Sequence, residues 1–260
     1  MMEHLCSPAI IVFLTLVLIL CLSGWYGVRV SRSGRALERA VAQDDMGTFR
    51  LATQRYGKLL RRDGVLACFV LEKLIRYNRV EWLPLLLQYQ SPEKLQTYRL
   101  EHMEPSLLSS VVTDGTPEML EALLVAGFDL GRDAESLWML CCKNCCVAHA
   151  RVLEAHGADT LSELHREVFL TSGESIYPLH AVVLGAMGRP QAALEMARYL
   201  VCEHGEDVNA LVAEGHTVLD LLDDEQFCRS DRVAPLRAFL LTHGAVHAED
   251  LTEVQQRAKS

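Results

Sequence analysis

The feature that most constrains the fold of this chain is a recurring pattern in which an apolar run with helical spacing ends at a glycine. A glycine just past a helix supplies the left-handed residue that closes the last turn, because it has no Cβ to clash there. Repetition of such a unit every few tens of residues predicts a row of similar helical elements. The four copies are Leu123–Gly127, Val152–Gly157, Leu200–Gly205 and Phe239–Gly244.

Two segments near the C-terminus carry a more specific pattern. Gly215–Leu222 reads Gly-His-Thr-Val-Leu-Asp-Leu-Leu, and Phe239–Ala245 reads Phe-Leu-Leu-Thr-His-Gly-Ala. Upstream, Pro178–His180 reads Pro-Leu-His at a predicted helix start, where proline suits the first helical position. Together these segments resemble the ankyrin repeat. The resemblance implies an all-α, ankyrin-type solenoid of stacked helix pairs, which binds another protein and does not catalyse a reaction.

The capping glycines are separated by 30, 48 and 39 residues, against a family period of about 33. The excess is predicted to form inserted loops near residues 160–176 and 223–232, where turn-forming residues dominate. We expect about six repeats in one domain over residues 31–250, followed by a tail at 251–260. Apolar residues spaced by three and four predict the divergent repeats among these at Ala36–Arg55, Val65–Tyr89 and residues 103–130.

The N-terminal segment is predicted to be a transmembrane anchor over residues 1–30. Residues 9–22 are apolar except for Thr15, and with residues 23–28 they reach about the 20 residues that a helix needs to cross hydrocarbon. A cleaved signal peptide is the alternative, since the apolar core alone is short. Glu3 stands where such peptides have a positive charge, and we therefore favour an uncleaved anchor.

Charge beside the anchor predicts its orientation. Four arginines follow the span directly and no Lys or Arg precedes it, so the positive-inside rule places the repeats in the cytoplasm. The simpler interpretation of these arginines is a topology signal, and contact with anionic headgroups is the alternative. They are Arg29, Arg32, Arg35 and Arg39.

Composition limits the partner and the compartment. After residue 28 the chain has a net charge of −8, which argues against nucleic acid as the main partner, since nucleic-acid binding usually needs a basic face. The nine cysteines include two adjacent pairs and would risk mispairing in an oxidising compartment. Both observations agree with a binding domain in reducing cytosol whose protein partner has a basic or cationic face.

The sharpest candidate for chemistry is Cys141–Cys146, which reads Cys-Cys-Lys-Asn-Cys-Cys. On a helix Cys142, Cys146 and His149 would share a face, and thiolates with imidazole are zinc ligands. Aligned with the ankyrin repeat, however, the first two cysteines replace alanines that let neighbouring helices approach, and Cys145 replaces the expected glycine. We therefore expect core packing here and predict no metal site and no cofactor.

Other catalytic patterns are absent from the sequence. It contains no Gly-x-Ser-x-Gly, no Gly-Lys-Ser/Thr phosphate loop, no His-Glu-x-x-His and no glycine-rich dinucleotide turn. The acidic run within Asp220–Glu225 does not follow the ligand order of a calcium loop and is interpreted as a solvated loop. His180 and His216 stand where the family ties helices and turns together, so the resemblance implies structural roles for both.

The resemblance also implies where a partner binds: on a concave surface made of the first helix of each pair and the turns before it. Side chains at variable positions of this surface select the partner. Trp138, on a predicted first helix, is interpreted either as core or as an aromatic anchor of the kind that dominates interface energies. The predicted partner-facing residues are Arg132, Asp133, Trp138, Lys143, Asn144 and Leu184.

Three hypotheses about function follow from these features. The first is a membrane-tethered binding protein or scaffold that recruits a cytosolic protein and has no small-molecule substrate. The second is a bacterial immunity or inhibitor protein that neutralises a secreted toxin or enzyme by direct binding, for which a periplasmic location is expected. The third is a metal or redox protein that uses the cysteine cluster.

Overall fold

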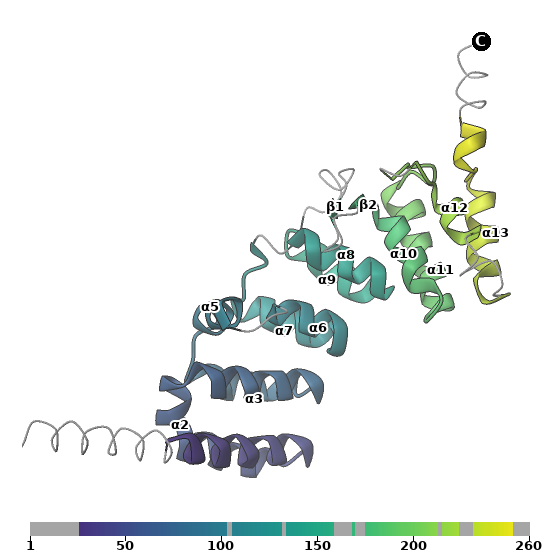
Figure 1. The fold of residues 1–260 in the computed structure, drawn as a ribbon. Helices are drawn as coiled ribbons and strands as arrows, with labels where there is room; N and C mark the ends of the chain where they lie inside the picture. Colours follow the sequence, from purple (N-terminus) through teal and green to yellow (C-terminus); the bar gives the residue numbers. More distant parts are fainter. Residues whose placement is uncertain are drawn as a thin grey trace, which may run out of the picture. The chain divides into compact units, whose positions relative to one another are not determined.

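The computed structural model describes residues 26–102, 106–131, 134–158, 168–169, 175–212, 215–223 and 231–251. The predicted all-α class is confirmed for these residues. They contain, besides helices, one short antiparallel strand pair, β1 (Val168–Phe169) and β2 (Ser175–Ile176) (Figure 1). The chain divides into two compact units between Glu104 and Pro105, which we call unit 1 and unit 2.

The predicted anchor and tail fall almost entirely outside the described residues. The description begins at Tyr26, within the last turns of the 1–30 segment, and ends at Leu251. Within it, no helix combines the length and the apolar character that crossing a bilayer requires. The anchor therefore stays a prediction, as does the single repeat domain over residues 31–250.

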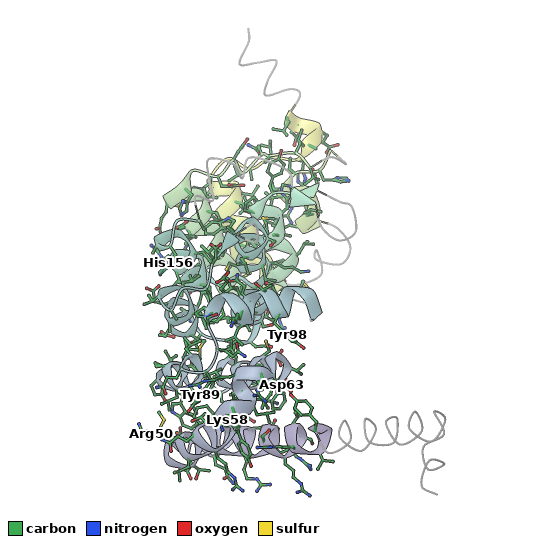
Figure 2. The ribbon with its side chains drawn as sticks, turned by 90° about the vertical axis from the view of Figure 1, so that its left-hand side faces the viewer. Arg50, Lys58, Asp63, Tyr89, Tyr98 and His156 are labelled. Atoms are coloured by element: carbon green, nitrogen blue, oxygen red, sulfur yellow. The ribbon has the colours of Figure 1, made fainter. Side chains whose placement is uncertain are left out.

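Unit 1 is built from helices joined by short turns. Two of these helices are capped by aspartates: Asp45 accepts a hydrogen bond from the Thr48 backbone N–H (2.8 Å) at the start of one helix. Asp63 accepts one from Leu66 (2.9 Å) at the start of the next (Figure 2). Each cap stabilises its helix by about 1 kcal/mol. A helix over residues 26–42 is followed by α2 (Met46–Arg62), α3 (Gly64–Arg76), η1 (Val80–Trp82), α4 (Leu83–Leu87) and α5 (Pro92–His102).

The core of unit 1 lies around α3, which packs against α2, α4 and α5. The helix over residues 26–42 reaches α3 through a 2.6 Å ion pair between Glu38 and Lys73. Phe49 of α2 and Trp82 of η1, both fully buried, place their ring centroids 4.9 Å apart. Buried Gln90 donates hydrogen bonds to the last carbonyls of α2, which a helix end otherwise leaves unpaired.

Unit 2 is a succession of short helices. Proline stands in the first turn of α7, α10, α11 and α13, where a missing N–H costs nothing. The helices are α6 (Leu107–Asp114), α7 (Pro117–Val125), α8 (Ala134–Asn144), α9 (Val147–Ala155), α10 (Pro178–Ala186), α11 (Pro190–Arg198), the π-helical turn η3 (Tyr199–Glu203), α12 (Val218–Asp223), η4 (Asp231–Val233) and α13 (Ala234–Thr242).

These helices pack in pairs that follow the sequence. Contacts join α6 to α7, α8 to α9, α10 to α11 and α12 to α13 (Figure 1). The first helices of the pairs also contact one another in order, because α8 packs against both α6 and α10, and α12 packs against α10. Among the second helices, α7 contacts α9 and α11 contacts α13. Each helix pair of unit 2 is therefore buried chiefly by its sequence neighbours.

Left-handed residues close the helices, as the glycine pattern predicts. The φ angles are 97° at Gly127, 84° at Gly157, 70° at Gly205 and 86° at Gly244. Cys145 also has a positive φ, 56°, so it adopts the conformation of the glycine that it replaces. The backbone then turns back onto its helix, as in the 2.9 Å bond from the Cys146 N–H to the Cys141 carbonyl.

Candidate partner-binding surface

The first helices of unit 2 and the turns at their ends carry the predicted partner-facing residues. Lys143 is exposed at the end of α8, and Asn144 beside it is partly buried. Leu184 of α10 is 39% exposed, which leaves its side chain available to a partner. Arg132 and Asp133 lie outside the described residues. The structure thus brings Lys143 and Leu184 to the surface on neighbouring helices.

Trp138 does not belong to this surface, because its side chain is fully buried. Its ring lies 6.1 Å from the rings of Tyr199 and His204, which belong to or follow the π-helical turn. Of the two interpretations of Trp138, the core position is the one observed, and a partner that binds the folded domain has no access to the indole.

The ends of α8 and α10 approach each other closely. A Cβ added to Gly185 of α10 would overlap the Lys143 carbonyl oxygen, so only glycine fits there. Arg189, just after α10, donates a 2.9 Å hydrogen bond from Nη1 to the Asn144 carbonyl. Asn144 therefore fixes the junction through its backbone, while the exposed side chain of Lys143 remains available for contact.

The cysteine cluster behaves as core. Cys141 and Cys142 are fully buried and Cys145 is 6% exposed, and none forms a disulfide. Burial raises the pKa of Cys142 well above its ordinary value and that of Cys145 to about 11, so both are protonated at neutral pH. In the described residues no three His, Cys, Asp or Glu side chains come together as a metal site. A packing role accounts for these thiols.

A group of polar side chains that sequence reasoning missed lies beside Trp138. The Tyr199 hydroxyl donates a hydrogen bond to Glu154, and His204 Nε2 lies 3.1 Å from the other oxygen of that carboxylate. Arg151 pairs with Glu203 at 2.7 Å and places its guanidinium 4.8 Å from the centre of the Tyr199 ring. The group joins α9 to the turn after α11.

Glu206, just after this turn, is a buried carboxylic acid. It is 5% exposed, and no hydrogen-bond partner for its Oε2 is found in the described part of the chain. Burial, and to a lesser degree the neighbouring charge of Asp207, raises the pKa of Glu206 to about 7. The burial of Glu206 could not be predicted from the sequence, because Glu206 stands in a polar run that resembles a solvated turn.

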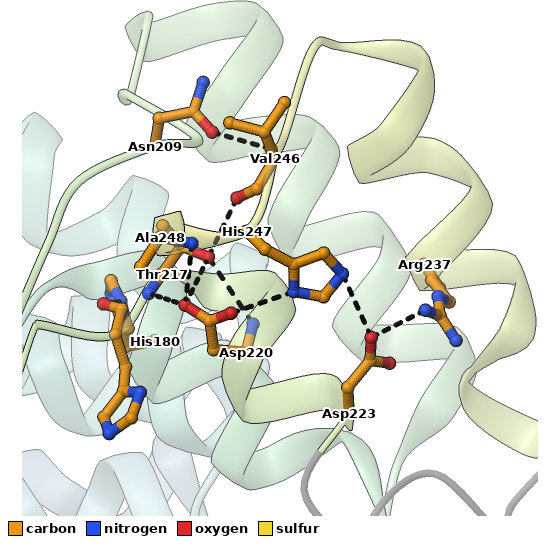
Figure 3. A network of polar contacts seen from close by, with 10 residues as sticks. His180, Asn209, Thr217, Asp220, Asp223, Arg237, Val246, His247 and Ala248 are labelled. Carbon is orange, nitrogen blue, oxygen red and sulfur yellow. Dashed lines mark hydrogen bonds and ion pairs between the residues drawn. The ribbon is translucent and has the colours of Figure 1, made fainter. Parts of the chain in front are cut away.

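A polar network ties the segment at residues 246–248 to α12 (Figure 3). Asp220 accepts hydrogen bonds from the Thr217 N–H (2.7 Å), the Ala248 N–H (3.2 Å) and His247 Nδ1 (2.8 Å). Burial alone would raise the pKa of Asp220, but these hydrogen bonds outweigh it and lower the pKa. Asp223 continues the network to His247 (3.3 Å) and Arg237 (2.7 Å).

This network corrects one interpretation and supports another. Asp220 and Asp223 are not part of a solvated loop, because each carboxylate is bound within the network. His180 has the structural role that was expected: its Nε2 lies 3.4 Å from the His216 carbonyl, which links α10 to the turn before α12. Burial lowers the pKa of His180 to about 4, so the imidazole is neutral near pH 7.

Comparison of the chain with known protein families, with curated proteins and with solved structures finds no match.

Proposed function

We propose that this chain is a membrane-tethered protein-binding module of the ankyrin type, held by residues 1–30 and recognising a partner protein through the first helices and turns of unit 2. In this proposal the domain acts by binding, as a scaffold or recruiter, and catalyses no reaction.

The observation that carries the proposal is the order of packing in unit 2. Consecutive helix pairs bury each other, first helix against first helix, and glycines in the left-handed conformation close them. This order of packing supports the proposal, because in an ankyrin-type solenoid each repeat is expected to contact only its neighbours and to present one continuous face. The link between His180 and the His216 carbonyl joins the two positions where the ankyrin resemblance implies ties between repeats.

Charge indicates the kind of partner. Residues 105–260 contain 11 Lys and Arg against 24 Asp and Glu, a net charge of −13. Opposite charge raises the rate of encounter between proteins, so a partner with a basic face is favoured. Leu184 supplies an apolar contact on the same proposed face, with Lys143 beside it.

A capture experiment with a matched pair of variants tests the proposal. The full chain, purified in detergent, is the bait, and retained proteins are identified by mass spectrometry. We expect Leu184→Asp, on the first helix α10, to weaken capture of the specific partner. Val125→Asp is the control, because Val125 is 71% exposed at the end of the second helix α7 and lies off the proposed face. Equal capture by both variants, or no specific protein with the parent chain, would contradict the proposal.

The identity of the captured protein separates the recruiter from the inhibitor form of the hypothesis. A cytosolic protein supports recruitment, whereas a secreted enzyme that loses activity on binding supports an immunity protein. A reporter fused after Ser260 gives the compartment independently, and a periplasmic signal would favour the immunity form.

A further inference from the structure

The two units carry opposite net charge. Residues 1–104 contain 14 Lys and Arg against 10 Asp and Glu, a net charge of +4, in contrast to −13 for residues 105–260. Although the net charge of the whole chain is −9, unit 1, which contains the proposed anchor, is therefore basic. Such an asymmetry within a chain indicates a membrane or nucleic-acid partner for its basic part.

The unbalanced charge of unit 1 lies on the solvent sides of two helices. The sequence of α2 contains no Asp or Glu, and its basic residues stand opposite buried residues such as Phe49 and Leu60. The helix over residues 26–42 repeats this arrangement, with Leu37 and Val41 buried. We call the exposed set the basic face: Arg32, Arg35, Arg39, Arg50, Arg55, Lys58, Arg61 and Arg62 (Figure 2, in which Arg50 and Lys58 are labelled).

Nearby carboxylates do not neutralise this face, because each is engaged elsewhere. Glu38 and Asp44 pair with basic residues outside the face, at 2.6 and 3.1 Å. Asp45 and Asp63 accept hydrogen bonds as the caps of α2 and α3. No residue of the basic face forms an ion pair with a carboxylate among the described residues. Within the described part of the fold, Arg55 and Arg61 lie 5.7 and 5.5 Å from the ring centres of Tyr56 and Tyr89, but these neutral rings leave the positive charge of the face without a balancing anion.

The basic face includes an exposed apolar side chain and lies next to the proposed anchor, and both features favour a bilayer as the anionic partner. Leu51 follows Arg50 on α2, within the basic face, and is 68% exposed. An exposed leucine among basic side chains can add apolar contact with lipid to the attraction between opposite charges. The face also begins at Arg32, directly after the proposed anchor, which would hold it within reach of headgroups.

We propose that the basic face of unit 1 binds the anionic headgroups of the membrane that carries the anchor. The inference rests on the anchor in the proposed function and is independent of the partner surface of unit 2. Its ligand is the phosphate and carboxylate chemistry of an acidic lipid surface, with Leu51 entering the interface between headgroups and chains.

Two exposed lysines give an internal comparison for the test. The full chain is reconstituted in nanodiscs of phosphatidylcholine alone or with phosphatidylserine, and acylation of lysines is followed by mass spectrometry. We expect Lys58, on the basic face, to react severalfold more slowly in the anionic discs, and Lys143, on unit 2, to react equally in both. About 1 M salt, where the Debye length is about 3 Å, should abolish the difference.

Substitutions test whether the basic face causes the slower acylation of Lys58 in anionic discs. Arg50→Glu with Arg61→Glu should remove the lipid dependence of Lys58 acylation, whereas Arg76→Glu, at an exposed base on α3 outside the face, should retain it. Circular dichroism establishes that both variants are folded. Loss of the effect in both would show a dependence on total charge and would contradict a defined face.

Further arms of the experiment separate the sources of negative charge. Equal acylation of Lys58 in both kinds of disc overturns the proposal. So does protection of Lys58 in neutral discs by inorganic phosphate or by a DNA duplex, which would assign the face to a soluble ligand or to nucleic acid. A chain that enters neither disc refutes the anchor, yet salt-sensitive protection of Lys58 on added phosphatidylserine vesicles would still support the basic face.

Discussion

Single residues at helix ends control how this chain folds back on itself. The glycines after α7, α9 and α13 and the one at Gly205 have positive φ, and in the described part of the chain no atom beyond the two adjacent residues lies within 4 Å of a Cβ built on any of them. These glycines are therefore needed for the left-handed backbone conformation and not for lack of space around the Cβ position. Cys145, in the same conformation, shows that the turn tolerates another residue at an energetic cost.

Gly127→Ala should destabilise unit 2 by about 1 kcal/mol, because alanine resists the left-handed conformation. The change should appear as a lower urea midpoint of unfolding. Gly47→Ala is the matched control, since Gly47 lies in the first turn of α2 without a positive φ, and its midpoint should not fall. Equal losses in the two variants would mean that the φ angle is not the cause.

Glu206→Gln should change how stability depends on pH. Because the pKa of folded Glu206 is raised from 4.5 to about 7, its contribution is full below pH 4.5 and is lost as the pH rises through 7. Glutamine cannot ionise, so the variant should be the more stable protein above pH 7, by about 3 kcal/mol at most, and the two should converge near pH 4.5. Urea unfolding at several pH values measures the difference in the free energy of unfolding between the two proteins. A difference that does not change with pH would contradict the raised pKa of Glu206.

Residues whose role is local could be predicted from the sequence, and residues whose role depends on distant contacts could not. Gly127 and His180 were interpreted correctly because their place in a repeat pattern implies their geometry. Asp220 and Glu206 stand in polar runs, and only the folded chain shows that Asp220 joins residues 246–248 and that Glu206 is buried.

Between elements, small residues set how closely helices approach. The junction of α8 and α10 depends on Gly185, whose missing Cβ leaves room for the Lys143 carbonyl, and on Cys145, whose thiol lies 3.9 Å from the Val182 carbonyl of α10. Backbone cannot move aside as the end of a flexible side chain can. This junction therefore leaves no room for a side chain at position 185.

Gly185→Ala should destabilise unit 2 by about 1 to 3 kcal/mol, the usual cost of overpacking a tight contact. Thermal unfolding followed by circular dichroism measures the loss. Gly188→Ala, in the turn that follows α10, is the control, because its Cβ would meet only an ordinary 3.9 Å contact. A Gly185→Ala protein as stable as the control would show that α8 and α10 do not approach as described.

At the scale of elements, the spacing of apolar residues predicted that helices are present, but it did not predict their detailed geometry. The segment at residues 103–130 does contain the pair α6 and α7, and Val65–Tyr89 contains α3, η1 and α4. The π-helical turn at Tyr199–Glu203 was not predicted, because nothing in a leucine-rich run distinguishes it from a regular helix end. The insertion predicted near residues 160–176 holds β1 and β2, whose pairing depends on a contact across the loop.

The whole molecule combines two units of opposite charge and different proposed roles. Unit 1 presents a basic face beside the proposed anchor, and unit 2 presents helix pairs with an excess of acidic residues. The proposed function depends most on unit 2 being a row of pairs rather than one indivisible core. In a row, a local defect weakens its neighbours and spares distant pairs.

Hydrogen exchange of the full chain carrying Leu219→Ala tests this claim most directly. Leu219 is fully buried in α12, and its loss should cost about 2 to 5 kcal/mol. If unit 2 is a row of pairs, amide protection should fall strongly in α12 and α13, less in α10 and α11, and not in α6 and α7. An equal fall of protection in all of these helices would show one cooperative core and contradict the account.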